Sequence, residues 1–190
     1  MRLEPFLAEH RETVIARWVD ALLGTYPDDT VRFFKKQKDR FTNPVGHTLS
    51  TEITHIFDEL LAGADPARIA PYLDNIVRIR AVQDYSPSQA LSFIFALKDV
   101  IRNQAEKSGK DAPSPEELWE FSKLIDATAL LAFDIFVQCR EKLYDIKAKE
   151  LRNMTFRLLQ RANVIADTER QDADPGEGEN NNEQQREVTQ

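Results

Sequence analysis

The stretch that most constrains the fold of this chain is a corner between two predicted helices, Ser86-Pro87-Ser88-Gln89. Ser86 suits the N-cap of a helix, and Pro87 suits the first helical position, where no amide hydrogen is needed. Gln89 completes a capping box three residues after the cap. Because Pro87 also disfavours helical geometry at Ser86, the preceding helix has to end by Tyr85. Two helices therefore meet here at a fixed angle.

Both helices carry polar or charged side chains inside their apolar stripes. At about 100° per residue, Arg80 and Gln83 fall on the apolar face of the first helix, and Lys98 falls on that of the second. Charges seldom lie on such a face unless they are paired or reach water. In a structural interpretation, Arg80 bonds Asp84 and the corner while Lys98 reaches water. In the alternative, Arg80, Gln83 and Lys98 border a site for an anionic ligand or a partner. We favour the structural interpretation for Arg80 and leave Lys98 open.

Two runs of the sequence resemble the N-terminal sensor domain of RsbRD-type stressosome co-antagonist proteins: VRIRAVQDYSPSQALSFIFALKDVIR and, upstream, RFTNPVGHTL. The resemblance is specific over these runs and extends over residues 3–143. It implies a globin-like, all-helical, dimeric domain that typically lacks haem and passes a signal through its last helix. In such proteins that helix leads into a STAS output domain, which the residues after Leu143 could not form. The resemblance therefore does not indicate the output of this chain.

Composition favours one sizeable domain with appendages, since domains commonly hold about 100 to 150 residues and this chain has 190. Hydrophobic residues make up 42% of the chain and charged residues 30%, which is typical of a globular protein in water. No window approaches the roughly 18 uninterrupted apolar residues of a membrane span, so we expect no membrane insertion. The opening MRLEPFLAEHRE carries charges too early for a secretory signal, and we expect a cytoplasmic protein.

The net charge of −7 is concentrated near the C-terminus. Residues 167–190 hold eight acidic and two basic side chains, which leaves the rest of the chain nearly neutral. No basic stripe is interleaved with aromatic residues, so nucleic-acid binding has little electrostatic support. Cys139 is the one cysteine, which excludes an internal disulfide and paired-cysteine zinc motifs. We expect it to be a small core residue.

Helix start and stop signals divide the first half of the chain. Apolar residues at steps of three and four predict a first helix from Leu3 to Thr25. The segment Asn43-Pro44-Val45-Gly46 has turn chemistry, with Gly46 free to take positive φ, and a helix follows it until Gly63. The next helix opens with Asp65 as N-cap and runs to the corner.

A second capping box, at Ser114, Pro115 and Glu117, begins a long helix that nothing breaks until Asp174-Pro175. A stretch of some 50 residues spans about 75 Å as a straight helix, so it must protrude or bend back. Its second half follows approximate heptad spacing with a slip near Lys149 and Glu150. The apolar residues of that second half are Leu143, Ile146, Leu151, Met154, Leu158, Ala162 and Ile165.

An apolar stripe of this kind has to be buried against another surface, and the simplest such surface is the same stripe of a second copy. We therefore expect a homodimer through Leu143, Ile146, Leu151, Met154 and Leu158, with an antiparallel fold-back onto the body as the alternative. Beyond Asp167 the sequence has no aromatic residue and one large aliphatic residue, Val188. Such a segment cannot offset its ordering entropy, and we expect it to be disordered.

No catalytic or metal-binding motif is present: the P-loop, G-x-S-x-G, H-E-x-x-H and dinucleotide fingerprints are all missing. His10 lies in the stripe of the first helix, where we expect a core histidine bonded to a neighbour. Glu116 and Glu117 point about 100° apart, which suits the helix dipole better than acid–base catalysis. We predict no enzyme, no cofactor and no metal.

Haem is the main competing interpretation because the resembled fold is globin-like. A haem globin needs an imidazole from the helix that precedes its last two long helices. Here that helix spans residues 67–85 and contains no histidine. A colourless protein without visible absorption above about 400 nm would separate a non-haem sensor from a haem- or small-ligand-binding globin.

These observations together predict an all-α, globin-like helical bundle with a long protruding C-terminal helix. We expect a globin-like sensor domain over residues 1–142, an exit and dimerisation helix over 143–166 and a disordered acidic tail over 167–190. The predicted function is non-enzymatic signalling: a dimeric non-haem sensor relays the binding of a ligand or an unknown protein partner through its last helix.

Overall fold

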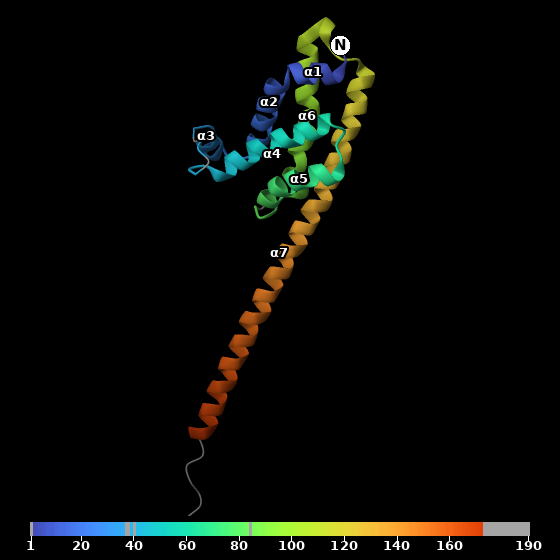
Figure 1. Ribbon diagram of the computed structural model, residues 1–190. Coiled ribbons are helices and arrows are strands. Elements are labelled where there is room, and N and C mark those ends of the chain that lie inside the picture. The colour runs from blue at the N-terminus through green and yellow to red at the C-terminus, as the bar shows by residue number, and fades with distance from the viewer. Residues whose placement is uncertain (1, 37–38, 40, 84, 173–190) are drawn as a thin grey trace, which may run out of the picture. The chain divides into compact units, whose positions relative to one another are not determined.

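The computed structural model describes residues 2–36, 39, 41–83 and 85–172, without the side chains of residues 35 and 163–172. Within these residues every regular element is a helix (Figure 1). The all-α bundle with a long last helix is therefore confirmed. In chain order the elements are α1 (Leu3–Glu9), α2 (Arg11–Leu23), α3 (Asp28–Lys36), α4 (Pro44–Leu61), α5 (Pro66–Ala81), α6 (Pro87–Ser108), the 3₁₀ turn η1 (Gly109–Asp111) and α7 (Pro115–Asp172).

The chain divides into two compact units, one up to Tyr144 and one from Asp145 onward. The first unit holds α1 to α6 and the first part of α7. There α4 packs against α5, and α2 lies against both α4 and α6 (Figure 1). The second unit is the remainder of α7, and every side chain described in it, from Asp145 to Ala162, is exposed.

Trp18 on α2 lies at the centre of the first unit and is fully buried. Its ring centroid is 6.4 Å from that of Phe93 on α6 and 6.5 Å from that of Phe57 on α4. The indole N–H donates a hydrogen bond to the carbonyl oxygen of Phe93 at 2.7 Å, so the one polar atom of this side chain is satisfied. Three helices are thus joined through one side chain.

The corner between α5 and α6 has the local geometry that its residues favour. Ser86 is the N-cap of α6, and its hydroxyl accepts a hydrogen bond from the amide of Gln89. The Gln89 side chain in turn accepts from the amide of Ser86 at 3.0 Å, which completes the capping box. Pro87 occupies the first helical position. Asp84 lies outside the described residues, so its expected bond to Arg80 does too.

Two helix boundaries differ from the expectations. The predicted helix from Leu3 to Thr25 is broken at His10, whose φ of −98° and ψ of 12° leave the helical range. The carbonyl oxygen of Phe6 accepts from the backbone amide of His10 at 3.1 Å and also bonds its ring nitrogen Nδ1 at 3.0 Å. Gly46 does not take positive φ, because α4 begins at Pro44 with Asn43 as its N-cap. The Asn43 side chain accepts from the Gly46 amide at 2.8 Å.

The last helix begins at the second capping box, where the amide of Ser114 donates to the Glu117 carboxylate and the Glu117 amide donates to the Ser114 hydroxyl. It continues to Asp172, so residues 167–172, where the tail was expected to begin, are helical. Residues 168–171, TERQ, contain no helix breaker, and the first proline is Pro175. Residues 173–190 lie outside the described part of the chain, and so does most of the predicted disordered tail.

Candidate functional site

Arg80, in the last turn of α5, is completely buried, with 0% of its surface exposed. Its Nε donates to the carbonyl oxygen of Ala90 at 2.8 Å, and its Nη2 donates to that of Gln89 at 2.9 Å. The guanidinium carbon lies 4.6 Å from the ring centroid of Tyr85 and 5.2 Å from that of Tyr26. The cation thus joins the end of α5 to the first turn of α6 and is covered by aromatic rings.

Three polar atoms around this guanidinium are buried and make no hydrogen bond of normal geometry, although the side chains of Arg80 and Gln83 both act on the Tyr26 hydroxyl as hydrogen-bonding neighbours. They are Nη1 of Arg80, Oη of Tyr26 and Oε1 of Gln83. Tyr26 and Gln83 also line a cavity of about 490 Å³. Its other lining residues are mostly apolar: Pro27, Thr30, Phe34, Val45 and Tyr85. We call this the Tyr26 cavity.

Burial raises the pKa of the Tyr26 phenol above its ordinary value of 10.0, and the positive charge of Arg80 opposes this shift. At neutral pH the phenol therefore keeps its proton and is available as a hydrogen-bond donor. Its ring contacts those of Phe34 and Tyr85 edge-on, with centroids 5.5 and 5.9 Å away. The hydroxyl is thus held among aromatic rings beside a cation.

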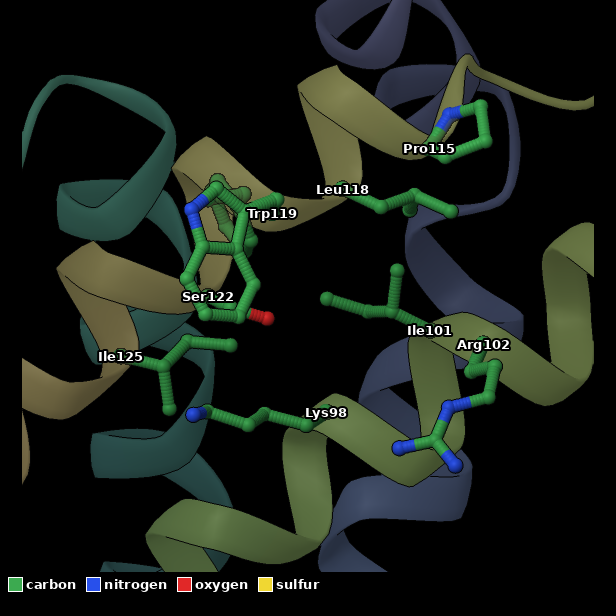
Figure 2. A pocket seen from close by; sticks show the side chains of 9 residues that line it. Lys98, Ile101, Arg102, Pro115, Leu118, Trp119, Ser122 and Ile125 are labelled. Carbon is green, nitrogen blue, oxygen red and sulfur yellow. The ribbon is translucent and has the colours of Figure 1, made fainter.

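Lys98 lies at a different site, in a groove of about 420 Å³ between α6 and the start of α7. Its Nζ donates to both carboxylate oxygens of Asp126, at 2.7 and 2.8 Å. Figure 2 shows Lys98, Ile101 and Arg102 on α6 opposite α7, with Trp119 and Ile125 on the other wall. The groove floor is apolar, and Trp119 at its rim is 68% exposed. Arg102 pairs with Asp99 on its own helix at 3.0 Å.

The residues proposed from the sequence therefore separate into two groups. Arg80 and Gln83 belong to the surroundings of the Tyr26 cavity, whereas Lys98 lines the α6–α7 groove. Sequence reasoning missed Tyr26 and Asp126. Tyr26 is separated from Arg80 by 54 positions and Asp126 from Lys98 by 28, and no local pattern links residues at such distances.

Large apolar side chains on the α7 part of the first unit are exposed: Trp119, Leu130, Phe133, Val137 and Tyr144. Phe95 on α6 is also exposed and has its ring 5.9 Å from Lys98 Nζ. Exposed apolar residues that follow one another at helical spacing are typical of an interaction surface rather than of a free helix face.

The second unit repeats this feature. Leu151, Met154 and Leu158 are 61–66% exposed, and Ile146, Phe156 and Leu159 are exposed as well. Leu143, which belongs to the first unit, is half-buried. In the sequence, steps of three and four residues connect Leu130, Phe133, Val137, Arg140, Tyr144, Lys147, Leu151, Met154 and Leu158.

Residues 12–151 match the family described as the RsbT co-antagonist protein rsbRD N-terminal domain. The chain belongs to this family. The RsbRD N-terminal domain thus covers α2 to α6 and α7 as far as Leu151, and with them both candidate sites. Membership assigns the chain to a stressosome-related class of regulatory signalling domains.

A curated relative of this RsbRD N-terminal domain is an uncharacterized protein of Archaeoglobus fulgidus. It is 23% identical over 145 residues, which cover 74% of this chain and 83% of that protein. No solved structure matches the chain.

The histidines of this RsbRD N-terminal domain do not fit a haem. Helix α5 has none. His10 Nδ1 bonds the carbonyl oxygen of Phe6 at 3.0 Å, and its ring stacks on that of Phe6. His47 and His55 are exposed. A haem ligand needs an imidazole that points into a pocket and is oriented by a second hydrogen bond, and none of these three meets that requirement.

Cys139 and the metal-ligating side chains are further candidates for catalysis or metal binding. Burial raises the pKa of the Cys139 thiol, and its Sγ lies 3.9 Å from a carboxylate oxygen of Asp74, which disfavours the reactive thiolate. In the part of the chain that the structure describes, no cluster of metal-ligating side chains is found. None of the described helices has a segment long and apolar enough to span a bilayer.

Proposed function

We propose that this domain is a non-enzymatic, homodimeric sensor without haem. A ligand or an as yet unknown protein partner binds to residues 1–144, the packing of two copies changes, and α7 passes the change to an output partner in the cytoplasm. A helix that two copies share is a suitable relay, because packed interfaces switch between discrete arrangements rather than deforming continuously.

One observation carries this proposal: along α7 from Leu130 to Leu158, seven of the nine positions at alternating steps of three and four hold exposed apolar residues. This is the a/d spacing of a coiled-coil seam. Fully burying one such side chain contributes about 1.5–3 kcal/mol, so several of them together offset the cost of association. Arg140 and Lys147 occupy the two remaining positions of this spacing; the guanidinium of Arg140 donates to the carbonyl oxygen of Ala81 and to the Tyr144 hydroxyl of its own chain.

The spacing modifies the seam expected from the sequence. Counting back from Leu151, Tyr144 falls on the same face, about 20° away, whereas Ile146 falls roughly 140° round the helix. Leu143 is half-buried in the first unit. We therefore propose that the seam runs through Tyr144 and needs no slip near Lys149 and Glu150, while Leu151, Met154 and Leu158 keep their expected places.

Substitutions at two equally exposed positions test the seam. Leu158 is 62% exposed and Phe156 is 61% exposed, but two residues of helix place them on nearly opposite faces. Leu158→Asp should weaken the dimer at least tenfold in dissociation constant, because a desolvated charge without a partner is costly, whereas Phe156→Asp should leave it unchanged. Analytical ultracentrifugation of both variants measures the difference.

Equal effects of Leu158→Asp and Phe156→Asp would refute the seam. Loss of the folded body in Leu158→Asp, followed by circular dichroism, would instead support the alternative in which the stripe folds back onto residues 1–144. The contrast therefore separates a dimer from an intramolecular cover.

A further inference from the structure

Arg80 carries a buried positive charge without a matching negative one among the described residues, which do not include Asp84. Both of its hydrogen bonds go to neutral backbone oxygens. No ion pair joins it to a carboxylate of the described residues. A buried charge with an unused donor is destabilising unless a counter-charge compensates it. The structure thus contains a place where an anion would be stabilised.

One of the two donors, the Tyr26 hydroxyl, belongs to a residue that lines a cavity, and Arg80 lies against the ring of that residue. Tyr26, whose hydroxyl makes no hydrogen bond of normal geometry, is itself 8% exposed and lines the cavity of about 490 Å³. Volumes of about 300–1,000 Å³ with a mostly apolar lining and a few polar groups are typical of small-molecule sites. Phe34, Val45 and Pro27 provide the apolar wall here.

We propose that Arg80 and Tyr26 bind the carboxylate of a small organic acid whose apolar body lies in the Tyr26 cavity, and that Gln83 turns aside to admit it. One carboxylate oxygen accepts from Nη1 of Arg80 and the other from the Tyr26 hydroxyl. These are charge-assisted hydrogen bonds, which are the stronger kind. This inference names the ligand class of the proposed sensor but does not depend on its being a dimer.

Gln83 has the properties of a side chain that can rotate to admit a ligand. It is half-buried, its Oε1 is covered but makes no hydrogen bond of normal geometry, and it lies just after the C-terminus of α5. Because the three polar atoms are covered in the free chain, a ligand reaches them only when a neighbouring side chain rotates. The amide oxygen has only a contact of poor hydrogen-bond geometry with the Tyr26 hydroxyl, so its rotation loses little.

Water alone accounts for the observations less well than an acid does. An ordered water molecule can satisfy two or three polar atoms, but it leaves the charge of Arg80 uncompensated and gives the apolar wall no partner. A phosphate or chloride ion would compensate the charge but leave the wall unused. An organic acid with a short hydrocarbon body compensates the charge of Arg80 and also packs against the apolar wall.

Isothermal titration calorimetry with the full chain tests the ligand class. The probes are sodium butyrate, hexanoate and octanoate; hexanamide serves as the uncharged match, and inorganic phosphate as the anion without an apolar body. We expect saturable binding of at least one acid, and binding of hexanamide at least tenfold weaker than that of hexanoate. Absence of binding by all three acids, or equal affinity for hexanamide or phosphate, would overturn the proposal.

Tyr26→Phe removes the hydroxyl and keeps the ring that covers Arg80. It should weaken acid binding about tenfold, as expected for one hydrogen bond to a charged group. Without ligand its melting temperature should be unchanged or higher, since a buried hydroxyl without a well-formed hydrogen bond is lost. Tyr72→Phe, which changes a half-buried tyrosine beside His55, is the matched control. Unchanged affinity in Tyr26→Phe, or a lower melting temperature without ligand, would show that the hydroxyl is a structural group.

Dimerisation is measured separately, by ultracentrifugation of the same samples. Acid binding by a monomer would uphold the ligand site and refute the dimeric relay, and a dimer without acid binding would do the reverse. The two proposals therefore fail independently.

Discussion

Arg80 is held by backbone oxygens of the first turn of α6 and by three aromatic rings, so its contribution to stability does not depend on a carboxylate. Arg78, two residues earlier on the same helix, pairs with Asp74 one turn back, and its side chain is 67% exposed. The two arginines differ in surroundings far more than in sequence position, which allows a direct comparison.

Arg80→Ala should lower the free energy of unfolding by about 2 kcal/mol or more, because a fully buried side chain is truncated and two hydrogen bonds are lost. Arg78→Ala should change it by less than about 0.5 kcal/mol, the usual range for an exposed ion pair. Urea denaturation measures both. A melting temperature of Arg80→Ala within a degree of wild type would contradict the structural role and leave ligand binding as the role of this residue.

At the scale of elements, the helix starts depend on local side-chain contacts that can be tested. A Cβ atom on Gly46 would lie 2.3 Å from Nδ2 and 2.7 Å from Oδ1 of Asn43. The N-cap of α4 therefore depends on the glycine. The side-chain amide of Asn43 can lie where it caps the helix because Gly46 has no side chain.

Gly46→Ala should displace the Asn43 amide and cost about 1 kcal/mol, similar to the loss of an N-cap in Asn43→Ala. The double variant should cost no more than Asn43→Ala alone, because the clash disappears with the amide. Thermal or urea unfolding of wild type and the three variants gives the four free energies of a double-mutant cycle. Additive losses would mean that the two positions act independently and that the capping contact is not what Gly46 preserves.

The start of α7 depends on the charge of Glu117. The backbone amide of Ser114 is the main cause that lowers the pKa of this carboxyl below its ordinary value of 4.5, and the amide of Leu3 acts in the same direction. A lowered folded-state pKa means that the stabilisation is present above pH 4.5 and is lost as the pH falls through the folded-state value.

Glu117→Gln keeps the hydrogen-bond acceptor and removes the titration. Its melting temperature should be lower than that of wild type at pH 7, and the difference should shrink as the pH falls below 4.5. Glu116→Gln, in the same turn but without these amide contacts, is the control. A difference independent of pH, or the same pH dependence in Glu116→Gln, would contradict the assignment.

The elements were predictable where their signals are local. The Ser86–Gln89 and Ser114–Glu117 capping boxes depend on residues three positions apart, and both are present in the structure. The break at His10 was missed because the apolar spacing continues through it. The Tyr26 cavity was missed because its walls come from distant parts of the chain, Tyr26 in one and Gln83 in another. Which residues of α7 form the seam stays a prediction, and the proposed register through Tyr144 differs from the expected one because Arg140 and Lys147 interrupt the apolar spacing.

At the scale of the whole molecule, the first unit has a well-filled core while α7 exposes large apolar side chains. In the first unit Trp18, Phe57 and Phe93 are buried, and in the second Leu151, Met154 and Leu158 are each more than half exposed. Such a contrast within one chain favours association, since exposed apolar residues in series mark interaction surfaces. We therefore expect a second copy of the chain to cover α7.

Multi-angle light scattering of the wild-type protein at micromolar concentration measures whether two copies associate. We expect a mass of twice the chain mass of 21.8 kDa, which Leu158→Asp shifts towards the single-chain value while Phe156→Asp does not. A wild-type mass of 21.8 kDa across the accessible concentration range would contradict this expectation.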